Sequence, residues 1–266
     1  KVKEKKVLIE KVGWIKINEQ IPINVKYNNP RITYDNKYWY LSVGIEVDKK
    51  QEELTNISLG IDLGLKELAI CSDGKVFKNI NKTKKVKKLE KRLKQKQRQI
   101  SRKYEINKIK KEGGERCQFI KTKNIKKLEN TTKLIYRKLA NIRNNYIHQV
   151  TTSIVKTKPY RIVIEDLNVS GMMKNKHLSK AIAQQGFYEF KRQLQYKATW
   201  NGGKVVFVPP QYTSQQCSQC GHTEKENRKI QAKFKCLTCG HETNADFNAA
   251  LNILAAGHAV IAHGVG

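Results

Sequence analysis

The sequence predicts an α/β fold: a mixed sheet interrupted by a long helical hairpin and a small cysteine-rich insert, with part of a β-barrel in front of it. Three observations predict this fold. Short β-branched runs alternate with longer stretches whose apolar residues recur every three or four positions. A single carboxylate stands in or beside several of the apolar runs, and two C-x-x-C pairs lie near the C-terminal end.

The composition points to a polyanionic partner. The 266 residues include 53 Lys+Arg against 23 Asp+Glu, a formal charge of +30 that would repel itself unless a polyanion such as nucleic acid lay nearby. The alternative is a merely soluble basic surface. A membrane-surface protein is disfavoured because the bases are spread over the whole chain. No apolar window approaches the ~18 residues of a membrane span and no signal peptide is visible, which predicts a cytoplasmic, nucleoid-associated protein.

The first 48 residues read as short strands. Apolar runs such as residues 7–9, 21–25 and 38–47 are separated by turn signals at residues 28–30 and 35–36. This pattern predicts part of a small antiparallel barrel whose Lys and Tyr side chains contact a nucleic-acid backbone; the alternative is an ordinary β-domain with surface lysines. The chain begins at Lys1 rather than Met, and we expect it to be a fragment or shortened form of a longer protein.

A lone carboxylate, Asp62, stands between two glycines in the apolar stretch 57–72. An acid in a strand that is otherwise buried costs free energy, so it usually has a compensating partner such as a metal ion. The alternative reading is a turn or capping residue. A turn at residues 73–74 and a third short strand at 75–80 follow.

Residues 81–158 predict a basic helical hairpin. In residues 82–103 twelve bases accompany a single acid, Glu90, while an apolar stripe keeps helical spacing. After a break at Gly113-Gly114, residues 122–156 predict a second helix with a coiled-coil-like seam. One reading is a solvated spacer; the other, favoured by the charge, is an arm that grips phosphates. The bases expected to contact nucleic acid are Lys84, Lys85, Lys88, Arg92, Lys96 and Arg98.

Two further carboxylates repeat the arrangement around Asp62. Glu165 ends the β-branched run 161–167, with Asp166 as its rival, and Asp246 opens an apolar helix at residues 244–254. Taken singly, Glu165 reads as a strand-end surface acid and Asp246 as a helix N-terminal acid. Together, three carboxylates from two strand ends and one helix start predict a site for Mg²⁺ or Mn²⁺, which prefer oxygen ligands. The order of elements is that of a ribonuclease H-like nuclease core.

Between these acids the chain predicts one more helix and one more strand. Residues 182–200 carry apolar residues at helical spacing and end at Asn201-Gly202-Gly203, and residues 204–208 form an apolar strand. Cysteine pairs follow at Cys217, Cys220, Cys236 and Cys239.

Two C-x-x-C knuckles at this spacing predict one structural Zn²⁺ held by four thiolates in a zinc ribbon. Each knuckle is followed by Gly-His, where glycine permits the tight turn; a redox pair is the alternative. His222 and His241 are possible substitute ligands, although four cysteines already close the site. Of the other cysteines, Cys71 is expected to be buried, and the pattern assigns no role to Cys117.

With these motifs in this order, the chain resembles the TnpB family of RNA-guided nucleases from OrfB-type insertion sequences, which are similar to compact Cas12-like effectors. The resemblance is carried by G-I-D-L-G at residues 60–64, I-E-D-L at 164–167, F-Y-E-F at 187–190, Y-T-S-Q-Q-C-S-Q-C-G at 212–221 and N-A-D-F-N-A-A-L-N-I at 244–253. Many relatives have Asp-Arg before the last catalytic acid, where this chain has Asn244-Ala245.

The resemblance implies a RuvC-like nuclease with Asp62, Glu165 and Asp246 as catalytic Mg²⁺ ligands, a guide RNA and a double-stranded DNA target. It also implies a division into a partial wedge barrel (1–48), three core parts (49–80, 159–211, 244–266), the hairpin (81–158) and the zinc ribbon (212–243). The earlier barrel strands and a helical recognition insertion are expected to be missing. The alternatives are a DNA transposase and a guide-dependent DNA-binding protein that does not cleave.

Overall fold

The structure is a computed structural model of the 266-residue chain, and it describes residues 1–47, 53–109 and 118–262. The chain divides into two compact units, residues 1–50 and 51–266. The predicted break at Gly113-Gly114 and Cys117 lie outside the described residues. Among the described helices, none has the length and apolar character needed to cross a bilayer.

The first unit consists of two small antiparallel sheets. Strands β1, β2 and β3 form a three-stranded sheet, and β4 pairs with β5 in a hairpin. Their bounds are Val2–Lys3, Lys6–Ile9, Gly13–Lys16, Tyr27–Tyr34 and Trp39–Ile45. The hairpin turns at the predicted site, where Asn36 has a positive φ of 69°. A partial barrel stays a prediction, because these strands form two separate sheets in the described residues.

Two sequence predictions in this unit are wrong. Residues 21–25 form no strand; Pro22 has no N–H to donate to a ladder. Asn28, Asn29 and Pro30 do not make a turn but lie inside β4, where the register shifts between Asn28 and Arg31. A bulge absorbs the proline and the positive φ of Asn29, so turn-forming residues sit within a strand.

The second unit is built on a five-stranded mixed sheet of order β12-β11-β6-β7-β8. The central pair β6 and β11 is parallel, as is β11 with β12, whereas β6, β7 and β8 form an antiparallel meander. The bounds are β6 Thr55–Leu63, β7 Glu67–Cys71, β8 Val76–Lys78, β11 Pro159–Glu165 and β12 Lys204–Val208. The predicted strands therefore form one sheet, which confirms the mixed α/β class.

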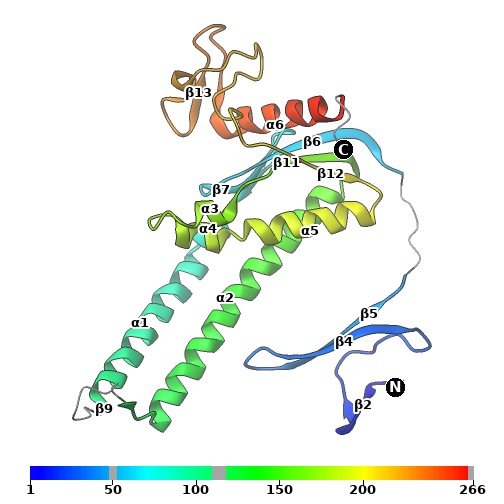
Figure 1. Cartoon of the computed structure of the whole chain (residues 1–266), viewed down its shortest axis with the longest axis vertical. Coiled ribbons are helices and arrows are strands. Elements are labelled where there is room, and N and C mark those ends of the chain that lie inside the picture. The colour runs from blue at the N-terminus through cyan, green and yellow to red at the C-terminus, as the bar shows by residue number, and fades with distance from the viewer. Residues whose placement is uncertain (48–52, 110–117, 263–266) are drawn as a thin grey trace. The chain divides into compact units, whose positions relative to one another are not determined.

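Helices cover both faces of this sheet (Figure 1). On one face, Ile61 and Ile164 belong to the main core with residues of α2, α4 and α5, including Phe190 and Leu194. On the other face, Val163 packs against Ile253 and its neighbours in α6 (Ala245–Ala262). Alternation along the strands thus separates two apolar layers.

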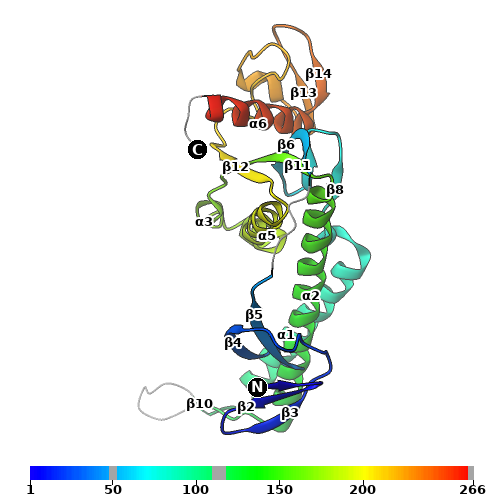
Figure 2. The same cartoon turned by 90° about the vertical axis from the view of Figure 1, so that its right-hand side faces the viewer.

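The helical hairpin is present as predicted. Helix α1 (Lys84–Ile106) follows the short η1 turn (Ile80–Lys82) and packs along α2 (Lys123–Val155), as Figure 2 shows. Val86 is fully buried against Ile135 and Leu139 of α2. At the far end, β9 (Lys108–Ile109) pairs with β10 (Gln118–Phe119). Threonine side chains cap the N-termini of both long helices.

The predicted helix at residues 182–200 is divided in two. Gly186 has a left-handed φ of 68° and separates α4 (Ser179–Gln185) from α5 (Phe187–Trp200). Left-handed backbone ends a helix, and glycine adopts it without strain. The predicted apolar residues Ile182, Phe187, Phe190 and Leu194 are nevertheless all buried. A short α3 (Val169–Met172) precedes this pair.

The cysteine-rich insert connects β12 to α6. It contains η2 (Lys225–Arg228) and the antiparallel hairpin β13 (Lys233–Lys235) with β14 (Glu242–Asn244). Strand β14 ends at Asn244 and α6 begins at the next residue, so the insert joins this helix directly.

Candidate active site and cysteine centre

Asp62 and Glu165 lie on neighbouring parallel strands. Ile61 of β6 pairs with Ile164 of β11, so each acid is the residue that follows a register pair. Adjacent strands lie about 4.8 Å apart, and paired residues of parallel strands point to the same face. Because Ile61 and Ile164 belong to the core under α2 and α5, the two acids lie on the opposite face, toward α6.

Gly60 brings α6 down onto that face. A Cβ added to Gly60 would lie 2.2 Å from the carbonyl oxygen of Ala250 and 2.8 Å from the Leu254 Cβ. Only a residue without a side chain allows this approach, which explains the first glycine of the G-I-D-L-G stretch. A second contact of the same kind brings Gly257 of α6 against Val163 of β11, where an added Cβ would lie 2.4 Å from Cγ2.

Asp246 lies close to these strands. It precedes Ala250, which contacts Gly60, by about one helical turn, and its charge raises the pKa of Asp62. Asn244 caps the helix through its Oδ1, which accepts the N–H groups of Asp246 (3.0 Å) and Phe247 (3.1 Å). Asp246 therefore enters the same region as Asp62 and Glu165.

Electrostatics connects the three carboxylates. Burial, followed by the charges of Glu165 and Asp246, raises the pKa of Asp62 to about 7, while the nearby Arg228 opposes this rise. Among the described residues, only the four cysteines form a group of three or more potential ligand atoms within 4.8 Å of one another. The three carboxylates are therefore not grouped as tightly as the four sulfurs, although the charges of Glu165 and Asp246 both raise the pKa of Asp62.

The buried side chain of Glu165 accepts a hydrogen bond from the hydroxyl of Thr213, with 2.5 Å between Oγ1 and Oε1. Burial raises the pKa of Glu165, and the Thr213 hydrogen bond and the charge of Lys191 lower it. Its sequence rival Asp166 has a side chain that is 73% exposed and forms an ion pair with Lys191 at 3.0 Å. Strand alternation therefore directs Glu165 toward Asp62 and Asp166 into solvent.

Asp246 has a partner that the sequence did not reveal. The guanidinium of Arg228 donates to Asp246 Oδ1 at 2.8 Å and also to the carbonyl oxygen of Gln231 at 2.8 Å. Arg228 belongs to η2 of the insert, far in sequence from the position before Asp246 where many relatives have an arginine and this chain has Ala245. No local signal identifies it, since it is one of many bases in the chain and its partner is eighteen residues away.

A pocket of about 420 Å³ opens beside Asp246. Ile70, which forms part of its wall, is the cross-strand partner of Asp62, so the pocket adjoins the carboxylates on the same face of the sheet. Its remaining lining residues are Lys66, Glu67, Gly74, Val76, Asn244 and Phe247. The volume lies within the range of ~300–1,000 Å³ that is typical of ligand pockets.

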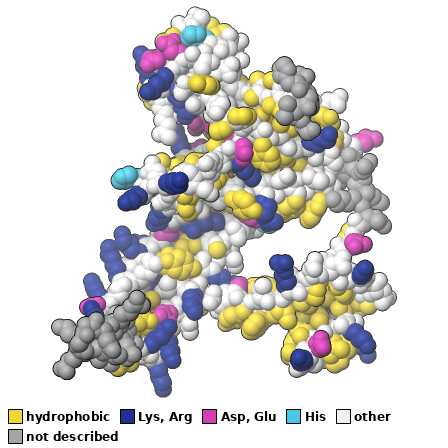
Figure 3. Space-filling model, in the orientation of Figure 1, with side chains coloured by type: hydrophobic (Ala, Val, Ile, Leu, Met, Phe, Trp, Pro, Cys, Tyr) yellow, Lys and Arg dark blue, Asp and Glu magenta, His cyan; other side chains and the backbone are white. Residues whose placement is uncertain are grey.

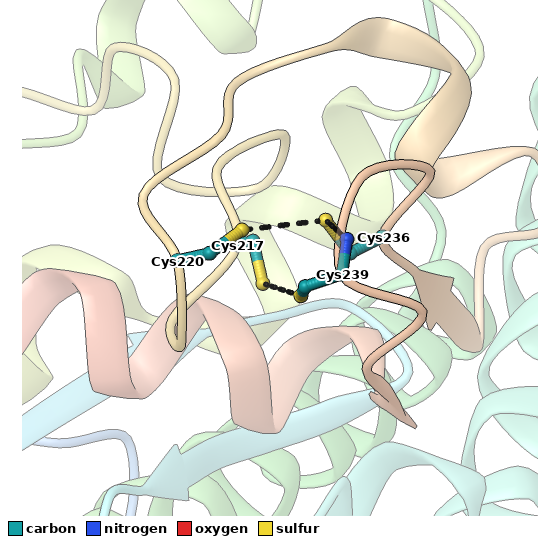
Figure 4. Close-up of side chains that lie close together, drawn as sticks. All are labelled: Cys217, Cys220, Cys236 and Cys239. Atoms are coloured by element: carbon teal, nitrogen blue, oxygen red, sulfur yellow. Dashed lines mark hydrogen bonds between the residues drawn. The ribbon is translucent and has the colours of Figure 1, made fainter.

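The four predicted cysteines converge (Figure 4). The Sγ atoms of Cys217 and Cys239 lie 3.7 Å apart and those of Cys220 and Cys236 lie 3.6 Å apart. All four sulfurs fall within 4.8 Å of one another, which suits one tetrahedral metal ion. The two knuckles are similar in backbone, because Gly221 (φ 76°) and Gly240 (φ 73°) donate their N–H groups to the carbonyl oxygens of the first cysteines.

The two histidines after the knuckles take no part in this group. His222 Nε2 lies 3.0 Å from Glu224 Oε2, and neither histidine joins the cluster of sulfurs. The remaining described cysteine, Cys71, is buried in the core of the sheet, and burial raises the pKa of its thiol to about 12. Cys71 is therefore a packing residue, as expected.

The predicted nucleic-acid contacts lie on α1. Five of the six bases are exposed, and Lys96 is half-buried with its ammonium 3.0 Å from Gln99 Oε1. Lys84, Lys88 and Arg92 follow one another at four-residue intervals, which places them along one side of the helix. Glu90 points elsewhere: it accepts from Arg143 of α2 and Gln184 of α4. Basic side chains gather over the hairpin in Figure 3, where they form a cationic surface.

Comparison with known families gives two matches. A model described as "Probable transposase" (OrfB_IS605) matches residues 40–176, and one described as "Cas12f1-like, TNB domain" matches residues 187–253. The second match includes all four cysteines, Arg228 and Asp246, and the first includes Asp62 and Glu165.

Curated relatives agree with these matches. The chain is 37% identical over 275 residues to "Putative RNA-guided DNA endonuclease InsQ" of Escherichia coli (strain K12), covering 97% of this chain and 64% of the relative. It is 38% identical over 146 residues to "CRISPR-associated endodeoxyribonuclease Cas12f1" of Sulfoacidibacillus thermotolerans, covering 53% of this chain and 32% of the relative. The chain thus spans less than two thirds of either protein.

Solved structures show a similar fold. A Cas12f1–sgRNA–target DNA complex matches with a TM-score of 0.55 and 22% identity, over 81% of this chain and 42% of that chain. A Cas12f ternary complex matches with a TM-score of 0.53 and 21% identity, over 94% of this chain and 50% of that chain. At this level of identity the likeness concerns the fold.

Proposed function

Because this chain belongs to the TnpB family, whose "Probable transposase" (OrfB_IS605) model matches half of it, we propose that it is part of an RNA-guided endonuclease that cuts DNA by hydrolysis. The catalytic carboxylates are Asp62, Glu165 and Asp246. The sheet order β12-β11-β6-β7-β8 supports a ribonuclease H-like, RuvC-like core for this chemistry.

The observation that carries the proposal is the electrostatic coupling of three acids on one face of the sheet. Burial, together with the charges of Glu165 and Asp246, raises the pKa of Asp62 to about 7, so Asp62 is partly protonated at neutral pH when no cation is bound. A divalent cation fits such a site, because it offsets the repulsion and takes the place of the proton. Asp62, Glu165 and Asp246 would hold Mg²⁺ or Mn²⁺, which activates water and stabilises the leaving oxygen during phosphodiester hydrolysis.

The protein supplies the position of these groups. Gly60 and Gly257 hold α6 close to the sheet, which keeps Asp246 beside the two strand-end acids. Arg228 places a guanidinium next to Asp246, where it can bind a phosphate oxygen of the substrate. The pocket beside Asp246 offers the DNA strand a path across β7 and β8.

The cationic surface of α1 binds the sugar–phosphate backbone of the guide RNA or of its duplex with the target. Lys84, Lys85, Lys88, Arg92, Lys96 and Arg98 supply charge without reading bases. Sequence would then be read by guide–target pairing, as in other RNA-guided effectors. Such backbone binding depends strongly on salt.

One structural Zn²⁺ completes the proposal. Cys217, Cys220, Cys236 and Cys239 close a four-thiolate shell, which leaves no open position for catalysis at the zinc. Its role is to fold the insert that carries Arg228 and leads into Asp246.

A single experiment separates this function from its alternatives. The full-length protein is expressed with its native flanking DNA, and the copurifying nucleic acid is sequenced. One discrete RNA, together with Mg²⁺-dependent cleavage of plasmids that carry a sequence matching part of it, supports guided cleavage. Binding of transposon DNA ends without RNA would favour a transposase. Guided binding without cleavage, unchanged in an Asp62→Ala variant, would indicate a DNA-binding protein that does not cut.

A further inference from the structure

Thr213 links the cysteine-rich insert to Glu165. It lies between β12 and the first knuckle, four residues before Cys217, and is only 6% exposed. Its hydroxyl donates to Glu165 Oε1 at 2.5 Å, a length typical of a charge-assisted hydrogen bond. The bond occupies one carboxylate oxygen and leaves the other for a different ligand.

Two buried asparagines of α6 fix the backbone at this point. Asn252 Nδ2 donates to the carbonyl oxygens of Thr213 (2.8 Å) and Gln216 (2.6 Å). Asn248 Nδ2 donates to the Gln216 carbonyl oxygen at 2.7 Å, while its Oδ1 accepts the N–H of Ser218 at 3.0 Å. Ser218 lies inside the first C-x-x-C knuckle. The knuckle, the Thr213 backbone and α6 are thus joined by a continuous set of hydrogen bonds.

This arrangement exceeds what packing requires. A valine has the shape of threonine and would fill the same space, but it would leave Glu165 Oε1 without its donor. Likewise, an apolar helix face would suffice to cover the segment, yet α6 presents two amides whose donors and acceptors match the backbone of residues 213–218. Groups that hydrogen-bond a metal-ligating carboxylate orient it and tune its affinity for the ion.

We propose that Thr213 is a positioning residue for Glu165, and that Asn248 and Asn252 make its position depend on the folded first knuckle. The inference rests on the proposed role of Glu165 as a ligand of the catalytic cation. Loss of zinc would then lower the affinity of the carboxylate site for its cation, because the position of Thr213 would change. Any effect through Arg228 would add to this loss.

The test measures occupancy of the carboxylate site without measuring DNA cleavage. The experiment uses the full-length protein with its copurified RNA. Fe²⁺ with ascorbate and peroxide cuts the polypeptide backbone near the site where Fe²⁺ is bound, and Mg²⁺ protects the polypeptide by competing with Fe²⁺ for that site. We expect Thr213→Val to require about 10–100-fold more Mg²⁺ for protection near the ends of β6 and β11. The zinc content of Thr213→Val stays at the wild-type value. Thr213→Ser, which keeps the hydroxyl, restores protection to within a few-fold of wild type.

Two outcomes overturn the proposal: wild-type protection of Thr213→Val, or a Thr213→Ser variant as weak as Thr213→Val. Glu165→Gln distinguishes this failure from failure of the proposed function. If Glu165→Gln leaves Mg²⁺ protection unchanged, the carboxylate assignment itself is wrong. If Glu165→Gln abolishes protection and Thr213→Val does not, only the role of Thr213 is lost.

The dependence on α6 is tested by a double-mutant cycle. Asn252→Ala is expected to weaken Mg²⁺ protection, and the Thr213→Val/Asn252→Ala double variant should be no weaker than Thr213→Val alone, because both changes act on the same hydrogen bond. Independent, multiplicative losses would contradict transmission through Thr213. Zinc content of each variant shows whether the knuckle itself is intact.

Discussion

The cysteine centre and the carboxylate centre are assembled in different ways. Four sulfurs lie within 4.8 Å of one another, and all come from residues 217–239. The carboxylates come from residues 62, 165 and 246, and burial together with the charges of Glu165 and Asp246 raises the pKa of Asp62 to about 7. The first centre is encoded by local spacing and glycine turns. The second depends on how closely a distant helix packs on a sheet, so it is the more sensitive to changes outside its ligands.

The largest effect on stability is expected from a change in the cysteine centre. Cys236→Ser should abolish zinc binding, since structural zinc contributes on the order of 10–16 kcal/mol in small zinc domains. Mass spectrometry should show no bound zinc, and proteases should cut within residues 212–243. Cys71→Ser is the matched control, because Cys71 is a buried thiol outside the cluster. Protease resistance of the zinc-free insert would contradict the prediction.

At the second centre, replacing one acid should stabilise the metal-free protein. Burial and repulsion raise the folded pKa of Asp62, so its contribution to stability is present below about pH 4 and lost as pH rises through 7. Asp62→Asn should therefore increase the free energy of unfolding at pH 8 by about 2–4 kcal/mol and leave it unchanged near pH 4. Urea unfolding in chelator across this pH range measures the effect.

The control for Asp62→Asn is Asp166→Asn, because the side chain of Asp166 is 73% exposed. Its unfolding curve should follow wild type at every pH. If the Asp62→Asn and wild-type curves run parallel from pH 4 to 8, burial and the neighbouring acids do not raise the pKa of Asp62 in the folded protein. Adding Mg²⁺ at pH 8 should reduce the difference in unfolding free energy between Asp62→Asn and the wild type, because Mg²⁺ stabilises only the wild type.

A substitution outside the three acids should also weaken Mg²⁺ binding at the carboxylate centre. Gly60→Ala places a Cβ 2.2 Å from the Ala250 carbonyl oxygen, so α6 must move away from β6. We expect a loss of about 3 kcal/mol in unfolding free energy, at the upper end of overpacking costs, and weaker Mg²⁺ protection at the carboxylates. Gly74→Ala is the control: its φ of 86° adds backbone strain, but nothing lies within 4 Å of its added Cβ. That variant should lose about 1 kcal/mol and keep its Mg²⁺ affinity.

The smallest effect is expected for RNA binding by the cationic surface, because its bases all lie on one helix, α1. Lys88→Gln and Arg92→Gln should each weaken RNA binding similarly for all sequences and reduce the slope of log affinity against log salt by about 1. Filter binding at several salt concentrations measures the slope. Lys204→Gln, an exposed base on β12, should leave the slope unchanged. Equal slopes for all three variants would place the RNA elsewhere.

The same contrast explains how much the sequence revealed. The convergence of the four cysteines was predicted correctly, because spacing and turn residues are local. The sheet that carries Asp62 and Glu165 was also predictable from apolar runs, whereas the role of the three acids stays a prediction. Thr213, Arg228, Asn248 and Asn252 were not, since each contacts groups that only tertiary packing brings near. Gly186 and the bulge in β4 were missed because one residue overrides an otherwise regular pattern.

The direct passage of β14 into α6 has a mechanical consequence. Asn244 ends the strand and Ala245 begins the helix, so the chain has no hinge between the ribbon and Asp246. A single inserted residue there would rotate the acid by about 100° around the helix axis. For the same reason, any change in the position of the cysteine-rich insert would pass directly to Asp246.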